Sequence, residues 1–228
     1  TGGNMPLSAT GISGGWGGNR ATREFVSLFD ITESDISETD FMFSTKPDKR
    51  ASFYFNPANW KWEITNPDNF TEGIGVIKYK NITSTGGEAE NPNGNYSSTD
   101  FPFFRTSDAY LMYAEAVLRG GSGGSRTKAL EYVNALRERA YGNTSGNISD
   151  SELTLDYIID ERGRELYWEC HRRSDLIRFG MFTGDAYLWQ WKGKAMTGVA
   201  TDSYRDLFPI PDTDLMANPN LEQNEGYK

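Results

Sequence analysis

Apolar residues recur at helical spacing in the second half of the chain and not in the first. From residue 106 onward they fall at positions i, i+3, i+4, i+7 and i+8, which share one face of a helix that Thr106 or Ser107 can cap. The residues on that predicted face are Ala109, Met112, Tyr113, Ala116 and Val117. The pattern stops at the glycine-rich run 120–124, which is too short for a domain linker and suits a turn between helices. A second helix is predicted from near Arg126, with the inward positions Ala129, Val133, Leu136 and Ala140.

Two antiparallel helices joined by a short turn resemble one tetratricopeptide-type unit, although no second copy occurs at the ~34-residue period of such repeats. A third helix is predicted after a polar loop, capped by Thr154 and continuing into the charge-rich segment 160–178. Its apolar stripe consists of Leu155, Ile158, Ile159 and Leu166. Near the end of the chain, two prolines around Ile210 force an extended segment, after which Asp212 can cap a last short helix.

The first half of the chain has the pattern of a loop-rich region. Glycine and proline interrupt it, and its β-like runs, at residues 51–55 and 75–80, are short. We therefore predict a mostly α-helical protein with a loop-rich subdomain at residues 1–104 and a helical region at residues 105–228. The two parts are expected to form one domain together.

Composition and charge exclude several classes of function. Hydrophobic residues make up 37% of the 228 residues and charged residues 24%, which suits a packed core. The net charge of -9 argues against binding to nucleic acid or to anionic lipid, because both need an excess of Lys and Arg. No apolar run approaches the roughly 20 residues that a membrane span needs. The single cysteine and single histidine exclude an internal disulfide and a zinc site built from several such side chains.

Three glutamates offer the first candidate for catalysis. Glu161, Glu165 and Glu169 are spaced four residues apart on one helix face, and a glycosidase needs two carboxyl groups about 5–10 Å apart. Each glutamate, however, has an arginine three or four residues away, among Arg162, Arg164, Arg172 and Arg173. Pairing with arginine lowers the pKa of a carboxyl group, whereas a general acid needs it raised. We therefore predict a structural ion-pair network and no enzyme activity.

A glycine-rich turn contains the most distinctive aromatic residue. Trp16 lies within Gly14–Gly18, where it either tucks into the core or stands exposed with no neighbouring side chain to crowd a ligand. Sugars pack their C–H faces on aromatic rings while their hydroxyls bind polar groups, for which Asn19 and Arg20 follow directly. The residues alone leave both interpretations open.

Two further tryptophan pairs are ambiguous in the same way. Trp60 and Trp62, and likewise Trp189 and Trp191, are separated by one residue. On a strand, each pair would place both rings on one face, which serves core packing as well as a ligand platform. Core packing is the simpler interpretation for both pairs.

A series of motifs covers nearly all of residues 100–228. It begins with Arg105-Thr-Ser-Asp-Ala-Tyr-Leu-Met-Tyr-Ala-Glu-Ala116 and continues through residues 129–140, 160–169 and 172–180 to the ending at 208–227. In order and spacing these motifs resemble the signature of the SusD/RagB family, the surface glycan-binding lipoproteins of Bacteroidetes polysaccharide-utilisation systems. Residues 180–193 and 223–228 look closest to the starch-utilisation member of that family.

The resemblance implies a fold and a binding site. The fold is a helical scaffold of tetratricopeptide-like pairs that carries a loop-rich, ligand-bearing subdomain. Trp16 occupies the place of a tryptophan in the aromatic arc that holds helical α-glucan, and Asn19 and Arg20 are its candidate polar partners. The family implies no catalytic residue and no cofactor, although some members hold a structural calcium. Asp100 matches one of the calcium ligands, whereas Ser98 stands where a second carboxylate would be.

The resemblance also implies a location and partners. We expect a chain that forms the C-terminal half of a longer outer-membrane lipoprotein, anchored at the extracellular face through an N-terminal cysteine that this chain does not contain. The expected partners are an oligosaccharide of the starch type, a SusC-like TonB-dependent transporter and the N-terminal half of the same protein. The alternative is a tetratricopeptide-like adaptor that binds protein and whose aromatic residues are structural.

Overall fold

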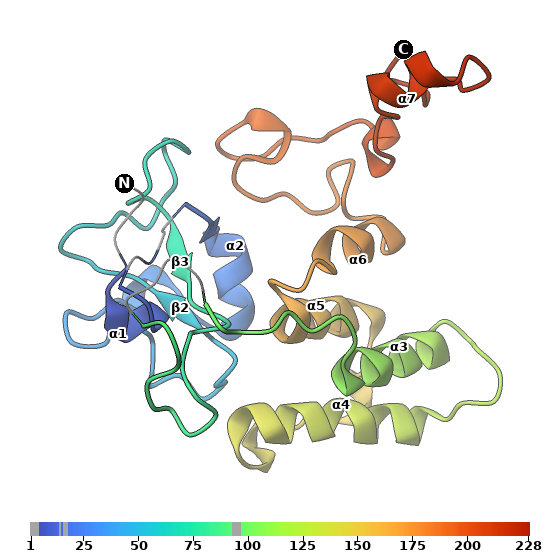
Figure 1. Cartoon of the computed structure of the whole chain (residues 1–228). Helices are drawn as coiled ribbons and strands as arrows, with labels where there is room; N and C mark the ends of the chain where they lie inside the picture. The colour runs from blue at the N-terminus through green and yellow to red at the C-terminus, as the bar shows by residue number, and fades with distance from the viewer. Residues whose placement is uncertain (1–4, 14, 16–17, 93–96) are drawn as a thin grey trace. The chain divides into compact units, whose positions relative to one another are not determined.

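The computed structural model describes residues 5–13, 15, 18–92 and 97–228 (Figure 1). The chain divides into two compact units, Thr1–Arg172 and Arg173–Lys228. The division predicted at residue 104 falls inside the first unit, just before its long helices begin. The fold is mostly helical with a few short strands, which confirms the predicted fold class. No helix in the described part of the chain is long and apolar enough to cross a membrane.

The loop-rich part of the first unit is built on a small antiparallel sheet. Its strands are β1 (Arg20–Ala21), β2 (Phe53–Tyr54) and β3 (Ile74–Val76), in the order β1-β3-β2. Both predicted β-like runs therefore contain strand, although the strands are shorter than the runs. The short helices α1 (Leu7–Thr10) and α2 (Arg23–Val26) and the 3-10 helices Ser27–Phe29 and Glu33–Asp35 complete this region.

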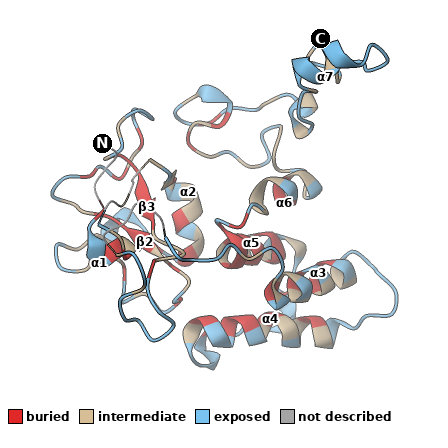
Figure 2. Cartoon of the chain, viewed as in Figure 1, coloured by how far each residue is buried: buried red, intermediate tan, exposed pale blue. Residues whose placement is uncertain are grey.

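Aromatic rings fill the core between the sheet and the helices. Phe53 of β2 packs edge-on against Phe29, with ring centroids 5.1 Å apart, and stacks on Tyr167 at 5.6 Å. Tyr167 follows helix α5, so a residue of the helical region lies in the core of the loop-rich region. Figure 2 shows buried residues along β2, β3 and α5. The two regions of the first unit therefore share one hydrophobic core.

The predicted helical hairpin consists of α3 (Thr106–Leu118) and α4 (Arg126–Tyr141), which pack against each other (Figure 1). Tyr110 stacks on Tyr132 with ring centroids 4.1 Å apart. The Ser125 hydroxyl accepts a hydrogen bond from the Lys128 N–H, and α4 ends at Gly142 with a left-handed φ of 74°. All four predicted inward positions of α4, Ala129, Val133, Leu136 and Ala140, are buried, as predicted. Whether the hairpin belongs to a tetratricopeptide-like array stays a prediction.

The predicted buried face of α3 is wrong. Ala109, Met112 and Ala116 are exposed, and the buried residues are Ser107, Leu111, Ala114 and Glu115. Two of these are polar and find partners: Ser107 accepts a hydrogen bond from Arg105, and Glu115 pairs with Arg119. Because these partners satisfy Ser107 and Glu115, both polar side chains can be buried. The pattern of apolar residues alone therefore predicted the wrong face. Neither Thr106 nor Ser107 caps the helix, whose N-cap is Arg105.

The third predicted helix is α5 (Leu155–Leu166), with Thr154 accepting a hydrogen bond from the Tyr157 N–H as expected. Ile158, Ile159 and Leu166 of its predicted stripe are buried. Two 3-10 helices, Thr144–Gly146 and Asp150–Glu152, lie between α4 and α5, and α6 (Arg172–Arg178) follows.

The second unit has little regular structure. It contains all of α6 except its first residue, 3-10 helices at Lys192–Lys194 and Ser203–Asp206, and the short helix α7 (Asp212–Ala217). The predicted last helix is therefore present, but its N-cap is Pro211 and Asp212 is its first residue. The Gln223 side chain accepts a hydrogen bond from the Ile210 N–H at 2.8 Å and donates one to the Ile210 carbonyl at 2.9 Å. These two hydrogen bonds hold the proline-flanked segment around Ile210 in place.

Candidate functional site

Two described residues that precede the predicted stacking tryptophan, Gly11 and Gly15, are held in place by other parts of the fold. Gly11 closes α1 at a φ of 75°, and a Cβ at this position would lie 2.2 Å from the Asn81 carbonyl oxygen. Gly15 pairs with Met5 through an antiparallel bridge. Trp16 itself lies outside the described residues. At Gly18 no heavy atom lies within 4 Å of the point that a Cβ would occupy, so open space adjoins the turn.

Asn81 organises the loops beside this turn. Its buried side chain donates to the carbonyls of Gly11 and Glu90 and accepts from the Ser97 hydroxyl and the Ser98 N–H. A pocket of about 150 Å³ opens next to it and is bordered by Gly15 and Ser97. The sequence analysis did not single out Asn81, because its partners lie far away along the chain.

The two predicted polar partners differ in their surroundings. Asn19 is exposed and follows the open position at Gly18. Arg20 is half-buried in β1, and its guanidinium donates to the carbonyls of Asn69, Glu72 and Pro67. Arg20 therefore holds the loop of residues 67–72 against the sheet.

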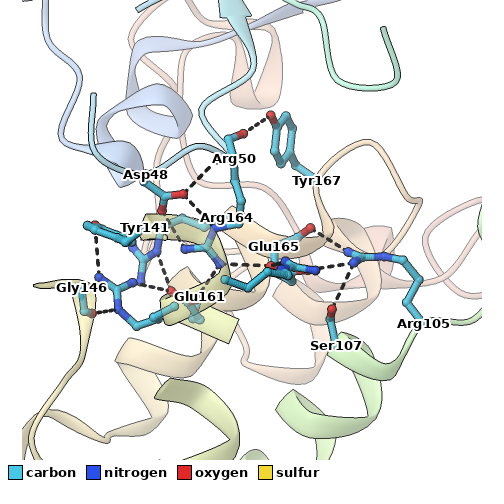
Figure 3. A network of polar contacts seen from close by, with 12 residues as sticks. Asp48, Arg50, Arg105, Ser107, Tyr141, Gly146, Glu161, Arg164, Glu165 and Tyr167 are labelled. Atoms are coloured by element: carbon cyan, nitrogen blue, oxygen red, sulfur yellow. Dashed lines mark hydrogen bonds and ion pairs between the residues drawn. The ribbon is translucent and has the colours of Figure 1, made fainter. Parts of the chain in front are cut away.

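The three glutamates lie in a buried ion-pair network, and Figure 3 shows the part of it around Glu161 and Glu165. Glu161 is fully buried and accepts from Arg50 at 2.7 Å, Arg164 at 2.8 Å and Arg137 at 2.9 Å. Burial by itself raises the pKa of Glu161, but the positive charge of the surrounding guanidiniums outweighs it and lowers the pKa to about 2. Such a carboxylate stays ionised and cannot act as a general acid near neutral pH.

Glu165 and Glu169 have similar surroundings. Glu165 binds Arg105 at 2.8 Å, Arg139 at 2.6 Å and Arg50 at 3.1 Å. Glu169 binds Arg105 at 2.7 Å and also pairs with Lys78. Burial raises the pKa of both carboxyl groups. The cations around them lower it by a larger amount, so the pKa of each group lies below its ordinary value. The arrangement supports the predicted structural network.

Most of the predicted pairings within this network are wrong. Arg164 does bind Glu161, but Arg162 binds Asp108 and Arg172 donates to the Ile159 carbonyl. The glutamates take their other partners from distant segments, including Arg50, which is oriented by Asp48 through two hydrogen bonds of its side chain. No local spacing in the sequence identifies such long-range partners.

The two ambiguous tryptophan pairs have different environments. Trp60 and Trp62 are 7% and 6% exposed, which confirms the core interpretation for that pair. Trp189 and Trp191, in contrast, are half-buried and line a pocket of about 580 Å³ that belongs entirely to the second unit.

Asp100, the calcium candidate, is exposed in the segment before α3. Among the described residues, no group of three or more His, Cys, Asp or Glu side chains could hold a metal ion. Calcium binding at Asp100 therefore stays a prediction.

Comparison with known proteins decides the family. The model of the SusD family matches residues 2–227. The chain belongs to the SusD family. A curated SusD relative, the starch-binding protein SusD of Bacteroides thetaiotaomicron, is 40% identical over 209 residues, which cover 91% of this chain and 36% of that protein. A SusD-like protein of Formosa agariphila, P25, is 34% identical over 147 residues, or 60% of this chain and 26% of that protein.

Solved structures of the SusD family have the same fold. A SusD-like protein from Bacteroides fragilis matches 98% of this chain with a TM-score of 0.63 at 20% identity, and the match covers 50% of that protein. A SusD superfamily protein from Bacteroides vulgatus matches 68% of this chain and 32% of its own, with a TM-score of 0.51 and 27% identity. The chain thus spans a third or so of the length of the curated relatives it matches, and half of the B. fragilis protein.

Proposed function

We propose that this chain binds oligosaccharide without chemical turnover, as part of a surface glycan-binding protein of the SusD family, and that its ligand is a starch-type α-glucan. The observation that carries the proposal is the 40% identity, over 91% of the chain, to a relative named for starch binding. The three glutamates support the absence of catalysis, since arginine and lysine side chains keep them ionised and bound within the fold.

In this proposal Trp16 is the ring on which the glucan stacks. Support comes from described residues on either side of it in the sequence. Asn81 donates a hydrogen bond to the Gly11 carbonyl, and open space adjoins Gly18. The exposed Asn19 side chain would bind sugar hydroxyls directly. Arg20 would shape the site through the carbonyls that it holds in the loop of residues 67–72.

The proposal extends to the whole protein of which such a chain is part. We place it at the extracellular face of the outer membrane, lipid-anchored through a cysteine outside this chain. There it would pass oligosaccharide to a SusC-like TonB-dependent transporter, with the N-terminal half of the protein completing the binding surface. Structural calcium at Asp100 is a subsidiary proposal, which a calcium-dependent rise in melting temperature would support.

The experiment is a titration of intrinsic tryptophan fluorescence with maltoheptaose, with a β-linked glucan as the control ligand. The chain and the full-length protein are titrated in parallel, as wild type and as Trp16→Ala. Trp168→Ala is the matched control, because Trp168 is 43% exposed and lies away from the turn in the sequence. We expect saturable binding of the α-glucan alone, lost in Trp16→Ala without a change in melting temperature and retained in Trp168→Ala.

Two results would contradict the proposal. If the full-length protein gives no saturable response to maltoheptaose, the α-glucan assignment is wrong. If Trp16→Ala lowers the melting temperature and leaves glucan binding intact, the aromatic residue is structural. The second result would favour the alternative of a protein-binding adaptor, for which the exposed Ala109, Met112 and Ala116 face of α3 is an available surface.

A further inference from the structure

The second unit contains a pocket whose chemistry differs from that of the rest of the chain. Its volume of about 580 Å³ lies within the range of ligand sites, roughly 300–1,000 Å³. Five of its lining residues are aromatic: Phe182, Trp189, Trp191, Phe208 and Tyr227. Neither the turn around Trp16 nor the carboxylate network contributes to it.

Two basic side chains of the lining, those of Lys192 and Arg173, lie against two of these rings. Lys192 is 3% exposed, donates to the Tyr187 carbonyl at 2.7 Å and lies over the Trp189 ring at 4.6 Å. Arg173 lies 3.9 Å from the centroid of the Phe208 ring and donates to the carbonyls of Arg205 and Asp206. Phe208 nevertheless remains 69% exposed. One side of the Phe208 ring is thus held in place while the rest is open, as a stacking platform requires.

The backbone at the rim of the pocket is strained. Trp191 and Lys194 have φ values of 68° and 65°, in the left-handed region that residues with a side chain rarely adopt. They flank Gly193, which has a φ of 64°. Strained backbone of this kind gathers at ligand sites, because the surrounding structure must hold it there. Here the left-handed residues turn the loop so that its residues Trp191 and Lys194 line the pocket.

The charges that line the pocket indicate the kind of ligand. Four lining side chains are basic (Arg173, Lys192, Lys194 and Arg205), whereas one, Asp202, is acidic. This excess is opposite in sign to the net charge of the whole chain, which is -9. A cleft lined by one sign of charge concentrates ligands of the other sign. Lys194 and Arg205 are exposed and are therefore placed to reach a bound anion.

We propose that this pocket is a second glycan site that binds a carboxylate-bearing sugar, a uronic acid residue. That the ligand is a sugar rests on the proposed function, while its negative charge follows from the pocket itself. The C–H face of the sugar stacks on Phe208 and Trp191. The carboxylate accepts charge-assisted hydrogen bonds from Arg205 and Lys194.

The test uses two oligosaccharides of equal length and α-1,4 linkage, trigalacturonate and maltotriose, titrated by isothermal calorimetry against the full-length protein. The charge variant is Lys194→Gln with Arg205→Gln. Its matched control is Lys128→Gln with Arg23→Gln, which removes one lysine and one arginine, both 42–46% exposed, from the first unit. The stacking variant is Phe208→Ala, with Phe103→Ala, 79% exposed in the first unit, as its control.

We expect trigalacturonate to bind more tightly than maltotriose at this site, and more weakly as salt is raised. Each pocket variant should lower trigalacturonate affinity about tenfold or more, while both controls and Trp16→Ala leave it unchanged.

Absence of trigalacturonate binding, or equal losses in pocket and control variants, would overturn the proposal. If Trp16→Ala alone abolished binding, the acidic sugar would belong to the first site and the pocket assignment would be wrong. Failure of maltoheptaose to bind the wild type would count against the α-glucan proposal and not against this one.

Discussion

Replacing Glu161 by glutamine keeps the shape of a fully buried side chain and removes its charge. Three guanidiniums, those of Arg50, Arg137 and Arg164, would then lose the anion that they share. Removing one partner of a buried ion pair typically costs about 3–5 kcal/mol, because the remaining charge is left uncompensated. We therefore expect Glu161→Gln to lower the free energy of unfolding by that amount.

The pKa of Glu161 gives a second route to the same magnitude. Its value falls from the ordinary 4.5 to about 2 on folding, and one pKa unit corresponds to about 1.4 kcal/mol, so ionisation contributes about 3 kcal/mol. Because the folded pKa is the lower one, this contribution is complete above about pH 5 and disappears as the pH falls towards 2. The stability difference between wild type and Glu161→Gln should therefore shrink over the same pH interval.

The assay is urea denaturation followed by far-UV circular dichroism, which reports mainly on the long helices of the first unit. Glu131→Gln is the matched control, since Glu131 is 64% exposed and solvent screens its pair with Lys128, which therefore contributes little to stability. The reasoning is refuted if Glu161→Gln costs no more than Glu131→Gln. It is equally refuted if the difference between Glu161→Gln and wild type is the same at pH 3 as at pH 7.

Three smaller substitutions test single features of the fold. Asn81→Ala removes four hydrogen bonds of a buried side chain and should cost about 2–3 kcal/mol in urea denaturation and weaken α-glucan binding; an unchanged affinity would separate Asn81 from the site. Gly142→Ala should cost about 1 kcal/mol from its φ of 74° alone, because no heavy atom lies within 4 Å of the new methyl group, and a thermal midpoint equal to wild type would contradict this. Thr154→Ala should cost about 1 kcal/mol through loss of the hydrogen bond to the Tyr157 N–H, whereas Thr154→Ser should restore the stability.

Helix positions were predictable where the signal is local. The start of α5 follows from Thr154, whose side chain accepts a hydrogen bond from a residue three positions later. The start of α4 was predicted near Arg126 from the apolar positions after it. The face of α3 was not predictable in this way. Met112 extends the apolar pattern and is exposed, while Glu115 interrupts it and is buried, because Arg119 supplies a partner that hydrophobic periodicity does not take into account.

The candidate sites were predictable to the extent that they depend on residue type alone. The family resemblance picked out Trp16 and its neighbours, whose role in binding stays a prediction. Arginine spacing was enough to predict that the glutamates are structural. The aromatic pocket of the second unit was not predictable, because Phe182, Trp189 and Phe208 meet only after the chain turns through left-handed residues between them. The sequence shows Trp189 and Trp191 as a pair and gives no sign that Lys192 and Arg173 lie against aromatic rings of the pocket.

The ion-pair network also has a consequence for the proposed glucan site. Lys78, which donates to the Glu165 and Tyr167 carbonyls and pairs with Glu169, lies just after β3 and three residues before Asn81. Asn81 in turn binds the Gly11 carbonyl at the start of the turn that carries Trp16. A short, continuous segment therefore connects the buried carboxylates to the loops of the site. In the proposed function, these carboxylates would influence glucan binding only through the position of that segment, and a charge-rich helix would serve the site without supplying a catalytic group.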